Sequence, residues 1–133
     1  MTPSELVSEY YAAFNRGDPD AMMALLTDDV RHDVNQGGHR TGKQVFAEFS
    51  AHMTRCYAER LTDIVVMESP CGTRAAAEFT VNGEYLATDE GLPEAKGQRY
   101  VLPAGTFFTI RDGKIARVTT YYNLTDWVRQ VST

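Results

Sequence analysis

The stretch from residue 74 to residue 85 alternates between apolar and polar side chains, which predicts a β-strand with one buried face. The apolar positions of this strand are Ala75, Ala77, Phe79 and Val81. A β-branched stretch over 61–68 precedes it and predicts a neighbouring strand. A chain with such strands requires a second layer that covers the apolar face.

Two further strands follow. Residues 98–111 predict a long strand that Pro103 and Gly105 bend or bulge. Asp112-Gly113 is a strong signal for a two-residue hairpin turn, and a last strand over 115–123 returns from it. The second half of the chain is therefore expected to form an antiparallel meander of four strands.

Helices dominate the first half. Thr2 and Glu5 form a capping box around Pro3, and the apolar residues that follow recur at helical spacing until Gly17. Asp18 caps a second, short helix.

A third helix is expected to begin at Thr41, which forms a capping box with Gln44. Its expected buried positions are Val45, Phe46, Phe49, Met53, Cys56 and Tyr57. A short strand over 30–35 precedes this helix, a closing helix over 124–131 ends the chain, and 87–97 is expected to be a polar loop.

The composition excludes several classes of protein. The net charge of −5 and the lack of a Lys/Arg cluster argue against a nucleic-acid partner. No run approaches the roughly 18 apolar residues of a membrane span, and the first residues do not resemble a secretory leader, so we expect a cytoplasmic protein. Cys56 and Cys71 are expected to be ordinary free thiols outside any metal-ligand spacing. No glycine motif for phosphate binding follows a strand, and neither a metal nor a cofactor is expected.

The order of these elements, together with three local matches, resembles the nuclear-transport-factor-2-like (SnoaL-like) superfamily and most closely its ketosteroid-isomerase-related proteins. The matches lie at residues 10–18, 25–30 and 75–85. The resemblance implies one α+β domain over residues 1–133, a cone-shaped curved antiparallel sheet with three N-terminal helices packed on its concave face. It also implies a pocket for a small apolar molecule and a homodimer formed through the outward face of the sheet, where Val101 and Phe107 are expected.

Ketosteroid isomerase uses an aspartate base and an oxyanion hole of a tyrosine and a protonated aspartate. The resemblance places the tyrosine at Tyr10, the base at Val34 and the second acid near Thr106. Valine cannot accept a proton, so the resemblance does not imply true steroid isomerase activity.

Two neighbours of Val34 are candidates for the missing base. His32 shares strand parity with Val34 and is expected to point inward, whereas Asp33 points to the other face unless a bulge turns it. Asn35 is a candidate for binding a carbonyl or orienting a water molecule, or else is an exposed residue at the strand end. Tyr10, His32 and Asp33 are thus the predicted catalytic residues.

Aromatic residues are expected to line the space between helices and sheet, because buried phenols need partners for their hydroxyl groups. The predicted binding residues of this kind are Phe14, Tyr57, Tyr85, Tyr100, Tyr122 and Trp127. They fit an enzyme that moves protons in a small carbonyl or epoxide compound, as an isomerase, cyclase or hydrolase. They equally fit a non-catalytic module that binds a ligand or assembles as a dimer.

Overall fold

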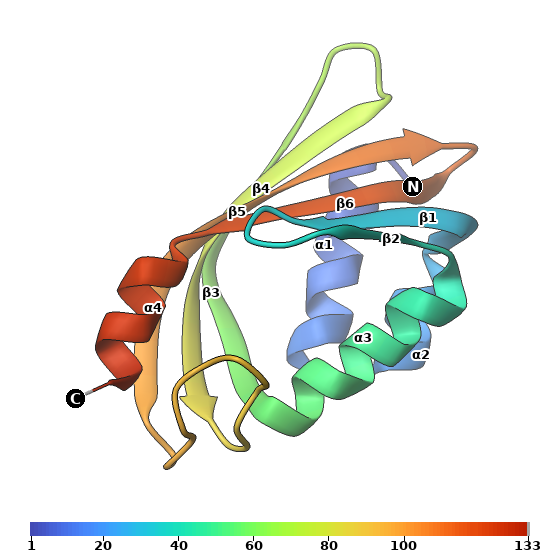
Figure 1. The fold of residues 1–133 in the computed structure, drawn as a ribbon. Helices are drawn as coiled ribbons and strands as arrows, with labels where there is room; N and C mark the ends of the chain where they lie inside the picture. Colours follow the sequence, from blue (N-terminus) through green and yellow to red (C-terminus); the bar gives the residue numbers. More distant parts are fainter. Residues whose placement is uncertain (133) are drawn as a thin grey trace.

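The computed structural model describes residues 1–132 as a strongly bent sheet with helices on its inner side (Figure 1). The elements follow in the order α1 (Pro3–Asn15), α2 (Pro19–Ala24), β1 (Leu26–Val34), β2 (His39–Thr41), α3 (Lys43–Cys56), β3 (Tyr57–Glu68), β4 (Arg74–Tyr85), β5 (Arg99–Arg111), β6 (Lys114–Tyr122) and α4 (Leu124–Val131). The α+β class and the curved sheet are therefore confirmed. Among the described residues, no helix combines the length and hydropathy that a membrane crossing requires.

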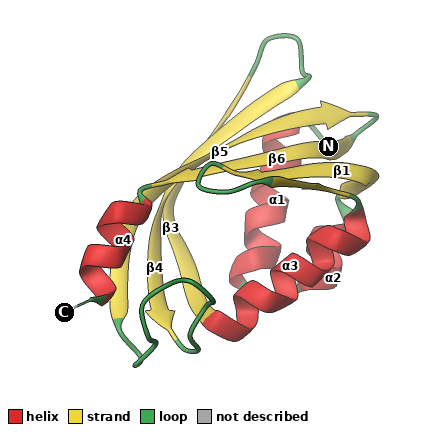
Figure 2. Ribbon diagram, viewed as in Figure 1, coloured by secondary structure: helices red, strands yellow, loops and turns green. Residues whose placement is uncertain are grey.

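The six strands form a single sheet in the order β2-β1-β6-β5-β4-β3. Neighbouring strands are antiparallel with one exception, since β1 and β6 run parallel. Sequence alone did not predict this parallel pair or the short strand β2, and His39 lies in β2 and not in a loop. Figure 2 shows α1, α2 and α3 together below one half of the sheet, with α4 at its other end.

The expected local signals at the first two helices are confirmed. Thr2 and Glu5 form the reciprocal capping box of α1, and the Asp18 carboxylate accepts from the amide of Ala21 at the start of α2. The α2 helix packs mainly on α1 and α3.

Three predicted boundaries are wrong. Helix α3 is capped at Gly42, with φ of 110° and no side-chain cap, because Thr41 is the last residue of β2. Tyr57 begins β3 and does not end α3, so this strand starts earlier than predicted. The first strand likewise starts at Leu26, and it ends at Val34.

The inner face of the sheet follows from the register. Ala75, Ala77, Phe79 and Val81 of β4 are buried as predicted. The ladder between β4 and β5 runs without a register shift past Pro103 and Gly105, so no bulge occurs there in that pairing. A bulge occurs instead in β3 between Thr62 and Val65, where Asp63 has a φ of 55°. The turn at Asp112-Gly113 has two positive φ angles, 52° and 74°, as a tight hairpin requires.

Candidate functional site

An aromatic cluster occupies the inner face of the sheet where β3, β4 and β5 meet α4. Tyr57 and Tyr85 stack with ring centroids 5.4 Å apart. Trp127 from α4 meets both rings edge to face, and it also meets Tyr100 at 5.9 Å. The structure thus brings together four residues that the sequence predicted as binding residues.

The partly buried carboxyl group of Glu59 contacts this cluster. Glu59 and Tyr100 both lie opposite Gly83 in the register, on either side of it, so they share the inner face. The hydroxyl of Tyr100 donates to Oε2 of Glu59 at 2.6 Å. Burial raises the pKa of Glu59 even though the hydrogen bond from Tyr100 works in the opposite direction.

Gly83 makes this pairing possible, because a Cβ at position 83 would lie 2.2 Å from Cζ of Tyr100. The ring of Tyr100 therefore lies directly over the backbone of β4. Burial, followed by the charge and the hydrogen bond of Glu59, raises the pKa of Tyr100.

Tyr122 at the end of β6 faces the same space. Burial raises its pKa, and the charges of Glu59 and Asp89 raise it further. Within residues 1–132, no side chain forms a hydrogen bond with the Tyr122 hydroxyl.

The irregular segment 86–98 closes over the aromatic cluster and is held by phenol groups. Tyr57 donates to Oδ2 of Asp89 at 2.7 Å. Tyr85 donates to the carbonyl of Pro93 at 2.7 Å and accepts from the amide of Asp89 at 2.9 Å. The hydroxyl groups of Tyr57 and Tyr85 therefore have protein partners, where the sequence had suggested that a cavity would supply them.

The N-terminal helix presents a different pair from the one expected. The hydroxyls of Tyr11 and Thr106 lie 2.6 Å apart. Thr106, near which the resemblance placed the second acid, therefore pairs with Tyr11 and not with Tyr10. Tyr10 is buried against Tyr11 and Phe108, burial raises its pKa, and no described side chain forms a hydrogen bond with its hydroxyl. Phe14, farther along α1, is partly buried against the core.

His32 points inward, as its strand parity predicted, and is almost fully buried. Its ring packs on Phe46 and Phe49 of α3, with centroids 4.5 and 4.7 Å away. Arg40 donates to its Nδ1 at 2.9 Å and lies over the Phe49 ring. Burial first, then the charge of Arg40, lowers the pKa of His32 to about 4, so the ring is neutral at pH 7.

Asp33 lies on the outer face, apart from His32. Its carboxylate accepts from Arg31 at 2.9 Å and from Thr119 at 2.9 Å. Partial burial works to raise its pKa, but these hydrogen bonds bring that pKa below the ordinary value. Asn35 is exposed beyond the end of β1, where its backbone N–H donates to the carbonyl of Thr120.

The structure therefore does not bring Tyr10, His32 and Asp33 into one hydrogen-bonded group. Their catalytic roles stay predictions. Sequence reasoning missed Glu59, because the strand was expected to begin only at Leu61. The signal was present: Tyr57 and Glu59 have the same parity as Leu61, so an earlier strand start would have placed all three on the inner face.

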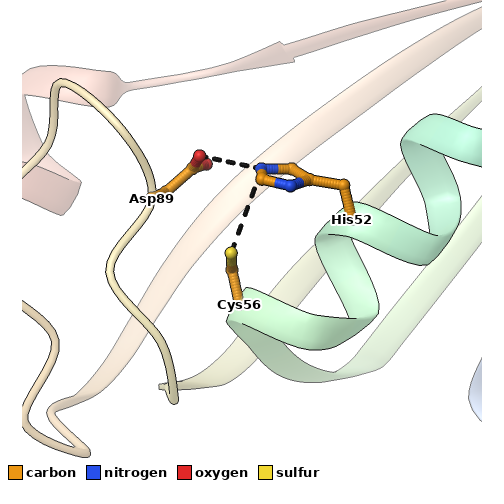
Figure 3. A group of neighbouring side chains, drawn as sticks. All are labelled: His52, Cys56 and Asp89. Atoms are coloured by element: carbon orange, nitrogen blue, oxygen red, sulfur yellow. Dashed lines mark hydrogen bonds and ion pairs between the residues drawn. The ribbon is translucent and has the colours of Figure 1, made fainter.

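A second polar cluster lies at the junction of α3 and the 86–98 segment (Figure 3). It consists of His52, Cys56 and Asp89, whose ligand atoms all lie within 4.8 Å of one another. The sequence analysis placed Cys56 outside any metal-ligand spacing, although Cys56 follows His52 by four residues.

Comparison with known proteins agrees with the fold. The chain is 66% identical to a "putative polyketide cyclase" from Pseudomonas putida KT2440, with 98% of each chain covered and a TM-score of 0.97. A protein of the same description from Silicibacter sp. TM1040 is 61% identical, with 97% of this chain and 94% of that chain covered and a TM-score of 0.95.

More distant similarities extend the comparison. An epoxide hydrolase from M. tuberculosis is 17% identical, with 97% and 88% of the two chains covered and a TM-score of 0.77, which shows the fold alone. The sigma factor SigJ of Mycobacterium tuberculosis is 31% identical to this chain over 84% of the chain's length. The matched region spans only 35% of the length of SigJ.

The SnoaL-like domain family matches residues 7–118. This match covers most of the chain, and the bent sheet with its N-terminal helices is the fold that such proteins share. The chain has the fold of an NTF2-like protein from Burkholderia pseudomallei, and it belongs to the SnoaL-like domain family.

Proposed function

We propose that this protein is an enzyme that moves protons with its own side chains in a small, largely apolar carbonyl compound, in a reaction of the cyclase or isomerase type. The observation that carries this proposal is the Glu59 carboxyl on the inner face of the sheet, held by the Tyr100 hydroxyl at 2.6 Å. Glu59 is partly buried, and a carboxyl with a raised pKa beside a group of aromatic rings is typical of a general acid or base.

The roles follow from the available hydrogen bonds. Glu59 is the base that removes a proton from the carbon next to a carbonyl. Tyr100 already donates to Glu59, so it positions the carboxylate. Tyr122 has no described side-chain partner and donates to the oxygen on which negative charge develops. Trp127 and Tyr85 provide apolar walls that exclude water.

A ring closure balances without any other reactant. The C–H bond breaks, its proton passes to Glu59, and the electron pair forms an enolate whose oxygen accepts a hydrogen bond from Tyr122. The enolate carbon then attacks a second carbonyl of the same molecule, and Glu59 returns the proton to the new alkoxide. An isomerisation uses the same first step and returns the proton to a different carbon.

The similar structures support this class of reaction. Proteins 57% to 66% identical to this chain bear the description "putative polyketide cyclase". The epoxide hydrolase is too distant in sequence to support an epoxide substrate. Val34 at the position of the steroid isomerase base argues against a true steroid isomerase.

A ligand-binding module without catalysis is the second candidate. The similarity to part of the sigma factor SigJ supports it, because a domain of this kind then forms one part of a longer regulatory protein. Such a role needs the aromatic enclosure but not the Glu59 carboxyl.

Proton exchange separates the two candidates without knowledge of the natural substrate. The protein is incubated in heavy water with a panel of small cyclic and linear diketones, and deuterium uptake next to the carbonyl is followed by NMR. Glu59→Gln should lower the enzyme-dependent rate by about 10²–10⁴-fold, the usual contribution of a general base. Glu68→Gln, an exposed residue of the same strand, serves as control and should retain the rate. Exchange that is equal in wild type and Glu59→Gln would favour the binding module.

A further inference from the structure

The side chains of His52, Cys56 and Asp89 come together from two separate parts of the chain (Figure 3). His52 and Cys56 lie four residues apart near the end of α3, so they occupy the same face of the helix. Asp89 reaches them from the 86–98 segment, and its Oδ1 lies 2.8 Å from Nε2 of His52. The Sγ atom of Cys56 lies 3.9 Å from the same nitrogen.

This arrangement differs from a Cys-His-Asp catalytic triad. In a triad the nucleophile and the carboxylate contact opposite nitrogens of the imidazole ring, so that one orients the ring and the other exchanges a proton with it. Here Sγ of Cys56 and Oδ1 of Asp89 both face Nε2 of His52. Three potential ligand atoms that converge on one point are the arrangement that a bound cation requires.

We propose that His52, Cys56 and Asp89 bind one divalent transition-metal ion, with Zn²⁺ as the best fit. Thiolate, imidazole and carboxylate are all ligands of Zn²⁺, and three protein ligands leave a fourth tetrahedral position for water. A thiolate and a carboxylate together also neutralise the charge of a divalent cation. The side chains of His52 and Asp89 are 38% and 21% exposed, which leaves a route for the ion to enter.

The neighbouring phenols already hold the carboxylate in position. Tyr57 donates to Oδ2 of Asp89, which leaves Oδ1 for the ion. The amide of Asp89 donates to the hydroxyl of Tyr85, which fixes the backbone at this position. Hydrogen bonds of this kind to metal ligands commonly change metal affinity by about 10–100-fold.

Arg55 holds the site in its metal-free form. Its guanidinium donates to Nδ1 of His52 at 2.8 Å, so Nδ1 acts as acceptor and Nε2 carries the proton that faces Asp89. Metal binding requires this proton to move to Nδ1 while the exposed Arg55 side chain turns toward solvent. The Cys56 thiol releases its proton to solvent as the sulfur–metal bond forms.

A metal ion at this point would join the 86–98 segment to the end of α3. The same segment covers the aromatic cluster through Tyr57 and Tyr85. The ion would therefore hold the 86–98 segment in place over the aromatic cluster, whatever reaction takes place there.

The test is a titration of the chelator-treated protein with Co²⁺, followed by absorbance, and then displacement of Co²⁺ by Zn²⁺. Wild type should bind one equivalent with a thiolate-to-cobalt charge-transfer band. Cys56→Ser should lose that band. Cys71→Ser is the matched control and should keep the band. Cys71 is an exposed thiol, and hydrogen bonds with Ser69 and Thr73 lower its pKa to about 7, so it is the other thiol that could bind Co²⁺.

Three more variants keep the test decisive if Cys56→Ser folds poorly. His52→Gln and Asp89→Asn change partly exposed ligands and should weaken Co²⁺ binding by at least about tenfold, as loss of a direct ligand exceeds loss of a supporting hydrogen bond. Arg55→Gln should tighten binding, because it removes a positive charge and the hydrogen bond that fixes the proton on Nε2. Absence of the thiolate band in wild type, retention of it in Cys56→Ser, or its loss in Cys71→Ser would overturn the proposal.

Discussion

The hydroxyl of Tyr100 donates to the Glu59 carboxylate at 2.6 Å across the backbone of β4, at the one position of the inner face where that strand carries no side chain. This relationship links the fold to the proposed chemistry. The missing Cβ of Gly83 admits the Tyr100 ring, and the hydroxyl of this ring orients the partly buried carboxyl of Glu59.

Gly83→Ala should displace the Tyr100 ring, because the added Cβ would lie 2.2 Å from it. We expect a loss of about 1–3 kcal/mol in the free energy of unfolding, the usual cost of overpacking. Chemical denaturation measures this cost. Gly105→Ala is the control, since its Cβ would have its nearest neighbour, the carbonyl oxygen of Ala77, at 3.5 Å. Equal stability of the two variants would contradict the close packing of Tyr100 on β4.

Glu59→Gln should make the protein more stable than wild type at pH 7. The pKa of Glu59 is raised in the folded state. Glu59 is therefore most compatible with folding at low pH, where it is protonated in both the folded and the unfolded chain. Its contribution to the free energy of unfolding is lost as the pH rises through the folded pKa. The thermal stability of Glu59→Gln and wild type should therefore converge as the pH falls toward 4. Glu68→Gln should follow wild type throughout. A Glu59→Gln protein that is less stable than wild type at pH 7 would argue against a buried, destabilising carboxyl.

His32 should make the protein sensitive to mild acid. Its folded pKa of about 4 lies below the ordinary value of 6.5, so the unfolded chain binds the proton first and stability falls as the pH decreases between these values. The expected loss between pH 7 and pH 5 is about 2 kcal/mol. His32→Gln should remove this loss in urea unfolding experiments, whereas His39→Gln, at an exposed position, should not. The same acid sensitivity in His32→Gln would assign it to another group.

Features of the fold were predictable from the sequence where the interacting residues lie close together along the chain. The capping box of Thr2 and Glu5 and the hairpin turn at Asp112-Gly113 involve neighbours, and both were predictable. The alternation in β4 also placed Phe79 and its companions on the buried face correctly. The family resemblance then supplied the arrangement of these pieces.

The candidate site was less predictable, because its contacts join distant segments. Glu59 meets Tyr100 across 41 residues, and a glutamate in a strand ordinarily indicates a solvated face. His52 meets Asp89 across 37 residues. The parallel pairing of β1 with β6 likewise depends on how the whole chain closes. Strand parity did place His32 inside and Asp33 outside, since that rule is local.

We also propose that two copies of the chain pair through the outer face of the sheet. Phe107 is 45% exposed there and meets Tyr121 edge to face at 5.5 Å, and Val101 is 57% exposed. Phe107→Glu should convert the dimer to a monomer in sedimentation experiments while circular dichroism stays unchanged. Val45 on α3 was expected to be buried but is 43% exposed, so Val45→Glu should leave the dimer intact. A monomeric wild-type protein at micromolar concentration would contradict the proposed interface.

The most direct test of the central claim is the pH dependence of carbonyl deuterium exchange in wild type and Glu59→Gln. If Glu59 is the base, the wild-type rate should rise with pH as this carboxyl loses its proton, with an apparent pKa above the ordinary value of 4.5. Glu59→Gln should be slow at every pH. A wild-type profile without this ionisation, or one that persists in Glu59→Gln, would contradict the assignment of Glu59 as the catalytic base.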